Sequence, residues 1–340
     1  MKPKFYISIL FILAASLLLF TECTKQELTN CGVAVRFKYT KNVYNVDKFS
    51  SEVSHIDLYV FDKDGNFLLK KSSPLVNGFL PENYEIKLPN LKPGTYTFVA
   101  WANANPEFFD TSALVEGITS FNNATLTYKD DGVNQHGKQL TQFYGSEFSL
   151  FYGSKFSVVV PEDASNTVVV PIDLTKYSNH IEVAVHGYPD GFDPNDFHCT
   201  IISKDGNYLF NGAFASTNPA ITFNADRPDA LLHGYDYGTL LFDFYTLRET
   251  DDNLTGAQLL ITYTRPSGEV IELRKEPLDP LLISVSNARQ GKNNRNTGSL
   301  DIDHEFFIDI DVIFNDTNNT VTIEINQWDE AGQIVKWPLG

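Results

Sequence analysis

The sequence has 340 residues, 42% of them hydrophobic and 13% aromatic, and its formal net charge is −17. This length suits two domains of ordinary size better than one. Such an acidic surface would repel phosphate backbones, which argues against nucleic acid as a partner. Because the charge is spread along the chain, we interpret it as a solvated exterior.

The N-terminal segment has the three parts of a secretory signal peptide. Lys2 and Lys4 precede an apolar run at 5–20, and Cys23 follows shortly after it. The run is shorter than the roughly 20 residues that a membrane-spanning helix needs. We therefore predict a signal peptide over residues 1–22.

A cysteine directly after such a run is where bacterial lipoproteins are cleaved and lipidated. We predict cleavage between Glu22 and Cys23, acylation of Cys23, and a lipidated N-terminal tether over residues 23–32. Several acyl chains would hold the protein stably to a membrane. Thr21 fits a lipoprotein cleavage site, but Glu22 is unusual there. An ordinary cleaved signal peptide and an uncleaved N-terminal anchor therefore remain alternatives.

The rest of the chain is typical of β-strands, with β-branched and aromatic residues in short runs separated by turn residues. Sustained helical periodicity is absent, and we expect only short helices near 46–53 and 226–232. The pattern predicts an all-β protein. The expected strands are 33–39, 56–61, 67–69, 95–101, 156–160, 167–174, 181–185, 240–247, 259–263, 306–314 and 321–325.

Two segments resemble each other. Residues 55–69 (HIDLYVFDKDGNFLL) and 198–210 (HCTIISKDGNYLF) both read as strand, Lys-Asp-Gly-Asn turn and return strand, which predicts a hairpin in each. The repetition is either a coincidence of a common turn or the mark of two β-sandwich domains of one design. We predict an N-terminal sandwich over 33–160 and a C-terminal sandwich over 166–340.

The cysteines define no metal site. If Cys23 is lipidated, Cys31 and Cys199 remain, and whether they pair is open because their distance cannot be read from the sequence. Paired spacing of the kind that zinc sites show is absent.

The signals for catalysis are poor. We interpret His180 and His186 as strand residues that share one face, because their separation is even. Motifs of nucleophilic, nucleotide-binding or HExxH sites are absent. We expect a hairpin turn rather than a calcium loop at 62–66, since a bidentate glutamate is missing. The sequence predicts no enzyme activity, cofactor, metal or small-molecule substrate.

One acidic group could suggest a metal, but it alternates with apolar residues as a half-exposed strand does. Its members are Asp301, Asp303, Asp309 and Asp311.

Six segments resemble, in order along nearly the whole chain, landmarks of the FimB-type fimbrial anchor lipoproteins. The segments are 31–39 (CGVAVRFKY), 53–62 (VSHIDLYVFD), 91–103 (LKPGTYTFVAWAN), 151–154 (FYGS), 168–174 (VVVPIDL) and 323–328 (IEINQW). The chain departs from that family at Glu22 and at 176–179.

The resemblance implies two tandem transthyretin-like, Greek-key β-sandwich domains. It also implies a lipid-anchored protein exposed at the outer membrane of a Gram-negative anaerobe, at the base of a fimbria. Its partners would be pilin subunits, joined by β-strand donation, and it could limit the length of the fibre.

The C-terminal tail contains the residues that we expect to meet the pilin: Ile334, Val335 and Trp337. After Trp328 the tail either folds back as a final hairpin strand or is offered as a strand to the first pilin.

The alternative function is a surface lipoprotein that binds glycan or a host protein through aromatic side chains. The chain has 16 tyrosines and 26 phenylalanines. Strand cores use the same residues, so the abundance of these residues does not decide between this function and a fimbrial anchor.

Overall fold

The computed structural model describes most of the chain after the tether. The described residues are 32–74, 76–129, 149–162, 167–186, 193–204, 206–215, 220–225, 239–248, 256–289, 300–315, 320–328 and 334–336, with only the backbone described beyond 311. The signal peptide, Glu22, Cys23, Cys31 and the helix expected near 226–232 lie outside them.

The first sandwich is built from two facing sheets. Its three-stranded sheet has the order β4-β1-β9, and its five-stranded sheet has the order β10-β8-β5-β2-β3. A short helix, α2 (Phe49–Glu52), confirms the helix expected near 46–53. The strands are β1 (Val33–Lys38), β2 (Ile56–Phe61), β3 (Phe67–Ser72), β4 (Glu85–Leu88), β5 (Gly94–Ala102), β8 (Phe151–Val160), β9 (Val168–Asp173) and β10 (Thr175–Lys176).

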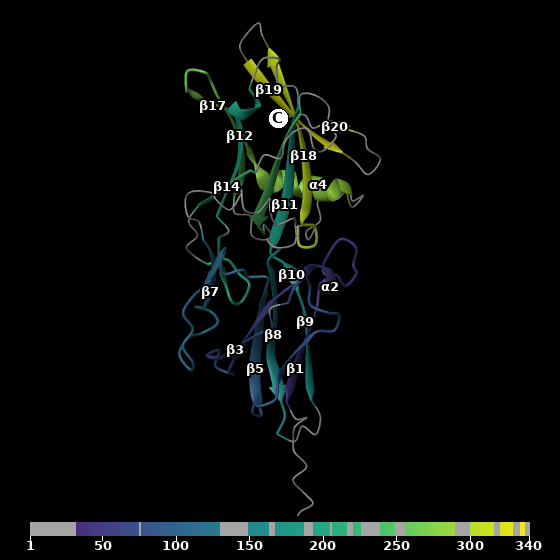
Figure 1. Ribbon diagram of the computed structural model, residues 1–340, viewed down its shortest axis with the longest axis vertical. Coiled ribbons are helices and arrows are strands. Elements are labelled where there is room, and N and C mark those ends of the chain that lie inside the picture. The colour runs from purple at the N-terminus through teal and green to yellow at the C-terminus, as the bar shows by residue number, and fades with distance from the viewer. Residues whose placement is uncertain are drawn as a thin grey trace, which may run out of the picture.

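The second sandwich lies beyond the first along the long axis of the molecule (Figure 1). One sheet has the order β15-β11-β18-β19-β20, and the facing sheet has the order β14-β12-β16-β17. The strands are β11 (Ser178–His186), β12 (Phe197–Ser203), β14 (Ile221–Asn224), β15 (Thr239–Leu247), β16 (Gln258–Thr264), β17 (Val270–Pro277), β18 (Glu305–Asn315), β19 (Thr320–Trp328) and β20 (Ile334–Lys336). Its described residues also form the helical segments η1 (Pro194–Asp196) and α4 (Leu278–Arg289).

A third sheet joins the two halves of the chain. It has the order β13-β7-β6 and combines β6 (Phe109–Thr111) and β7 (Thr125–Tyr128) with β13 (Asn207–Leu209). This all-β architecture confirms the predicted fold class. Within the described part of the chain, neither α-helix is long and apolar enough to span a membrane.

The strand that follows the predicted domain junction completes the first sandwich. β9 runs parallel to β1, from Val33 opposite Val168 to Lys38 opposite Asp173, and β10 pairs with β8. The second sandwich was predicted to begin at residue 166, whereas the pairing places the passage to its first strand, β11, at Tyr177.

The first Lys-Asp-Gly-Asn segment is a hairpin, as predicted, and the second is not. β2 and β3 pair antiparallel, and the Asp62 carboxylate accepts backbone N–H bonds from Asp64 and Asn66, both at 2.9 Å. In contrast, β12 pairs with β14 and β16, and β13 pairs with β7. The prediction of a second hairpin is therefore wrong.

Helix α4 is one of the elements that the sequence analysis missed, together with the strands β4, β6, β7, β14 and β17. Apart from Asp279, its buried side chains are spaced four apart, at Leu278, Leu282 and Ser286, and both leucines belong to the hydrophobic core. A serine in the third position interrupts the apolar stripe from which an amphipathic helix is normally predicted.

The central strands of the five-stranded sheet of the first sandwich, β2 and β5, are buried on both faces. On β2, Leu58 and Val60 belong to the core between the two sheets of the sandwich. Tyr59 and Phe61, on the opposite face, belong to a second core that continues into the second sandwich. This explains why all six residues of IDLYVF are buried, because strands covered on both faces read as continuous apolar runs.

Trp101 lies at the centre of the contact between the sandwiches, and its side chain is completely buried. Its ring centroid lies 4.8–6.3 Å from four other rings. We name the five residues the aromatic joint: Trp101, Tyr152, Tyr177, Tyr208 and Phe210. Burial of Tyr208 and Phe210 against Trp101 is the physical reason that β13 leaves β12 and pairs with β7.

We expect Trp101→Ala to lower the free energy of unfolding by about 3–5 kcal/mol, because it removes a fully buried aromatic side chain and leaves a cavity. Urea denaturation followed by far-UV circular dichroism measures this. Val159→Ala is the matched control, since Val159 is 65% exposed on β8, and it should change stability by less than about 0.5 kcal/mol. Equal effects of the two substitutions would refute the role of the joint.

Candidate functional site

The predicted partner-binding residues Ile334 and Val335 form part of β20, the last described strand. β20 pairs antiparallel with β19, with Ile334 opposite Trp328 and Val335 opposite Gln327. The structure therefore has the tail folded back as a hairpin strand at 334–336. Trp337 lies outside the described residues.

β20 covers only a small part of the β19 edge. On one side, β19 pairs with β18 from Thr320 to Asn326. On the other side, β20 pairs with Asn326, Gln327 and Trp328 alone. Within the described chain, residues 320–325 thus have no strand partner on that side. Six residues of strand extend about 20 Å and present a row of unpaired N–H and C=O groups.

The opposite edge of the same sheet is formed by β15, which pairs with β11 along its whole length. Most of the β15 side chains are buried.

The first sandwich is closed by its own first strand. β1 lies in the middle of its sheet, between β4 and β9, and its side chains Val33, Val35 and Phe37 are at most 1% exposed. A strand from another subunit could take the central position of this sheet only by displacing β1.

The two ends of the described chain lie in different sandwiches. β9 leads into the second sandwich and β1 is parallel to it, so Val33 and Val168 lie at the end of the first sandwich away from the second. We call this end the N-terminal pole. In Figure 1, β1 and β9 lie in the lower sandwich, and β19 and β20 lie in the upper one.

Charged side chains fix the junction between the sandwiches. Lys176, whose side chain is 10% exposed, lies 3.3 Å from a Glu52 oxygen of the first sandwich and 3.7 Å from a Glu305 oxygen of the second. Arg248 pairs with Asp301 and lies 5.0 Å from the ring centroid of Tyr177. Lys176 and Tyr177 belong to the segment 176–179, where the chain departs from the FimB-type pattern.

The cysteine and acidic residues singled out in the sequence do not form a common site. Within the described residues, which do not include Cys31, Cys199 is a buried thiol of β12 without a disulfide partner. Burial raises its pKa, so it is a poor nucleophile. Asp301 pairs with Arg248, whereas Asp309 lies 2.6 Å from His186.

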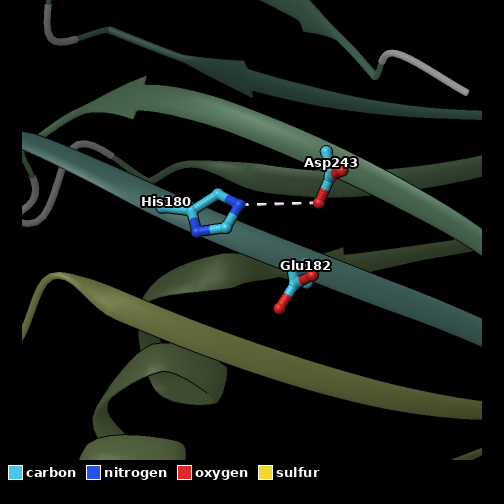
Figure 2. Close-up of side chains that lie close together, drawn as sticks. All are labelled: His180, Glu182 and Asp243. Atoms are coloured by element: carbon cyan, nitrogen blue, oxygen red, sulfur yellow. Dashed lines mark ion pairs between the residues drawn. The ribbon is translucent and has the colours of Figure 1, made fainter. Parts of the chain in front are cut away.

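The side chains that do converge are His180, Glu182 and Asp243, on the outer face of the β11–β15 pair (Figure 2). The sequence indicates only that His180 and Glu182 share a face. The register of β11 with β15 brings Asp243 opposite Glu182.

The comparisons with known proteins establish the family. A profile of the family described as fimbrillin-A associated anchor proteins Mfa1 and Mfa2 matches residues 27–333. The chain therefore belongs to this family of fimbrial anchor proteins, which confirms the resemblance seen in the sequence.

One curated relative is the minor fimbrium anchoring subunit Mfa2 of Porphyromonas gingivalis. It is 26% identical over 188 residues, which make up 55% of this chain and 55% of that protein. The match thus spans about half the length of the curated relative.

Two solved structures share the fold. A proposed adhesin from Bacteroides ovatus superposes with a TM-score of 0.71 and 18% identity, over 93% of this chain and 97% of the other. The fimbrial anchor protein Mfa2 from Porphyromonas gingivalis superposes with a TM-score of 0.69 and 22% identity, over 90% and 99% of the two chains. At these identities the likeness shows the fold alone.

We expect Lys176→Met to reduce the free energy of unfolding by about 1–3 kcal/mol, because a largely buried charge-assisted contact is lost while the aliphatic stem is kept. Urea denaturation of the two proteins measures the difference. In the control, Lys63→Met removes an ion pair whose partners are 70% and 61% exposed, and the denaturation midpoint should not move. An unchanged midpoint for Lys176→Met would contradict the role of this lysine.

Proposed function

We propose that the protein is the lipid-tethered anchor subunit of a cell-surface fimbria and holds a shaft of pilin subunits to the outer membrane. Family membership supports the anchor role. The observation that carries the proposal is the placement of the two ends: β1 begins at the N-terminal pole, and the open β19 edge lies in the other sandwich. The tether 23–32 would lead from a lipidated Cys23 directly into β1.

Strand exchange at the β19 edge is the proposed mode of attachment. β20 pairs with three residues of β19, whereas a longer strand could pair with all nine. Because ladder hydrogen bonds supply the affinity in strand addition, a pilin strand beside β19 would displace β20. The released tail, with Ile334, Val335 and Trp337, would then be free to pair with the pilin in turn.

The closed first sandwich supports a terminating role. A shaft assembled by strand exchange grows only while each new subunit offers a groove. Since β1 already occupies the middle of its sheet, the first sandwich would offer no vacant central groove to the strand of a further subunit. The anchor would in this way end the shaft at the membrane and limit the length of the fibre.

The proposal assigns no enzymatic activity, cofactor or small-molecule substrate to the protein. The alternative of a glycan or host-protein receptor would need exposed aromatic rings. The rings of the aromatic joint are buried, so they cannot serve as such a platform.

The lipid tether is tested with Cys23→Ala. We expect the variant to lose the acylated N-terminal peptide in mass spectrometry, to leave the membrane fraction, and to release fimbriae into the medium. The matched control is Cys31→Ala, in the same tether, which should keep lipid and fibres. Membrane retention of Cys23→Ala would overturn the tether, whereas a pull-down of the lipidated protein without any pilin would overturn the anchor.

The role of the tail is tested by deleting residues 333–340. We expect a folded, lipidated protein that no longer retains fimbriae, as measured by pull-down from the cell envelope. Deleting 338–340 alone is the control, since it leaves β20 and Trp337 in place. Normal fibre retention without 333–340 would contradict the role of the tail.

A second variant tests whether β20 must leave β19 for the protein to retain fibres. A disulfide between Gln327→Cys and Val335→Cys, which are register partners, would hold β20 on β19. If exchange is required, the locked protein retains no fibres until a reductant is added. Full retention by the oxidised protein would exclude exchange.

A further inference from the structure

The outer face of the second sandwich carries a group of ligand-type side chains that fimbrial anchoring does not use. His180 and Glu182 are two residues apart on β11 and therefore point to the same side of the sheet. Asp243 is the register partner of Glu182 on β15. One ligand atom from each residue lies within 4.8 Å of the others, and Figure 2 shows the His180 ring directed toward Asp243.

The His180 ring is held in one orientation from two directions. Its Nδ1 lies 2.9 Å from Glu305 Oε2 on β18. The ring stacks on Tyr245 with 4.7 Å between centroids and 11° between planes. Histidines that bind metals usually direct the other ring nitrogen to a carboxylate in this way, which fixes the tautomer and leaves Nε2 for the metal.

The spacing at Nε2 fits two ligands of one ion better than a direct hydrogen bond. Nε2 lies 3.5 Å from Asp243 Oδ1, beyond the usual 2.7–3.2 Å of an N–H···O bond. Tetrahedral zinc with bonds of about 2.1 Å holds its ligands about 3.4 Å apart. Asp243 Oδ1 is also buried without a hydrogen-bond partner among the described residues.

The local charge favours a divalent cation. Three carboxylates lie around the ring, those of Glu182, Asp243 and Glu305. A divalent cation bound among them would compensate more of this negative charge than a single proton.

We propose that His180 Nε2, Glu182 and Asp243 bind a divalent transition metal of the zinc class, with Glu305 orienting the histidine. The imidazole ligand selects zinc-class ions over calcium and magnesium, which take oxygen ligands. A rotation of the flexible Glu182 side chain closes the remaining separation. The fourth position is left to solvent.

Zinc chloride titrated calorimetrically into the mature protein without a polyhistidine tag tests the site at pH 7.5. We expect one equivalent to bind. Co²⁺ should give the visible absorption of a four-coordinate site. His180→Ala and Asp243→Asn should abolish binding, and Glu305→Gln should weaken it about 10–100-fold.

His186→Ala is the matched control, because His186 lies on the same face of β11 and pairs with Asp309. This variant should bind zinc as the parent does. Failure of the parent protein to bind, or binding that survives His180→Ala, would overturn the site. Thermal unfolding without metal shows whether each variant is folded, so a lost site is distinguished from a lost fold.

Discussion

The structure depends on one sheet whose central strands, β2 and β5, are buried on both faces. One face of the five-stranded sheet closes the first sandwich, and the other packs through Trp101 against rings from the second half of the chain. Burial of large aromatic side chains contributes more to stability per residue than most other contacts. The two sandwiches are thereby joined by a continuous core, and the Lys176 ion pairs to Glu52 and Glu305 reinforce the junction at its rim.

The two sandwiches differ in how completely their strands are paired. The first sandwich has β1 in the middle of its sheet, and Val33 and Phe37 are buried there. The second sandwich ends in β20, a strand of three residues beside a strand of nine. A membrane tether at the first and a strand partner at the second would act on opposite ends of one joined body, as an anchor between a membrane and a fibre requires.

Local patterns predicted the strands well and their partners poorly. The turn at Asp62 forms as expected because the carboxylate bonds the backbone of its own turn. The same Lys-Asp-Gly-Asn sequence after β12 does not produce a hairpin. The following strand, β13, pairs with β7, and Tyr208 and Phe210 pack against Trp101. Helix α4 was missed because the polar residue Ser286 occupies one of its buried positions. A helix is predicted from regularly spaced apolar residues, and the serine interrupts that pattern.

The sequence by itself determined the all-β class, most strand positions and the family, because alternation, turn residues and ordered landmarks are local properties. It also predicts the signal peptide and the lipidated Cys23, which the described residues do not include. Only the tertiary structure decided that β9 closes the first sandwich, that residues 320–325 have no strand partner on one side within the described chain, and that Asp243 lies beside His180. Each of these depends on which strands become neighbours, and that choice is made by the burial of side chains far apart in the chain.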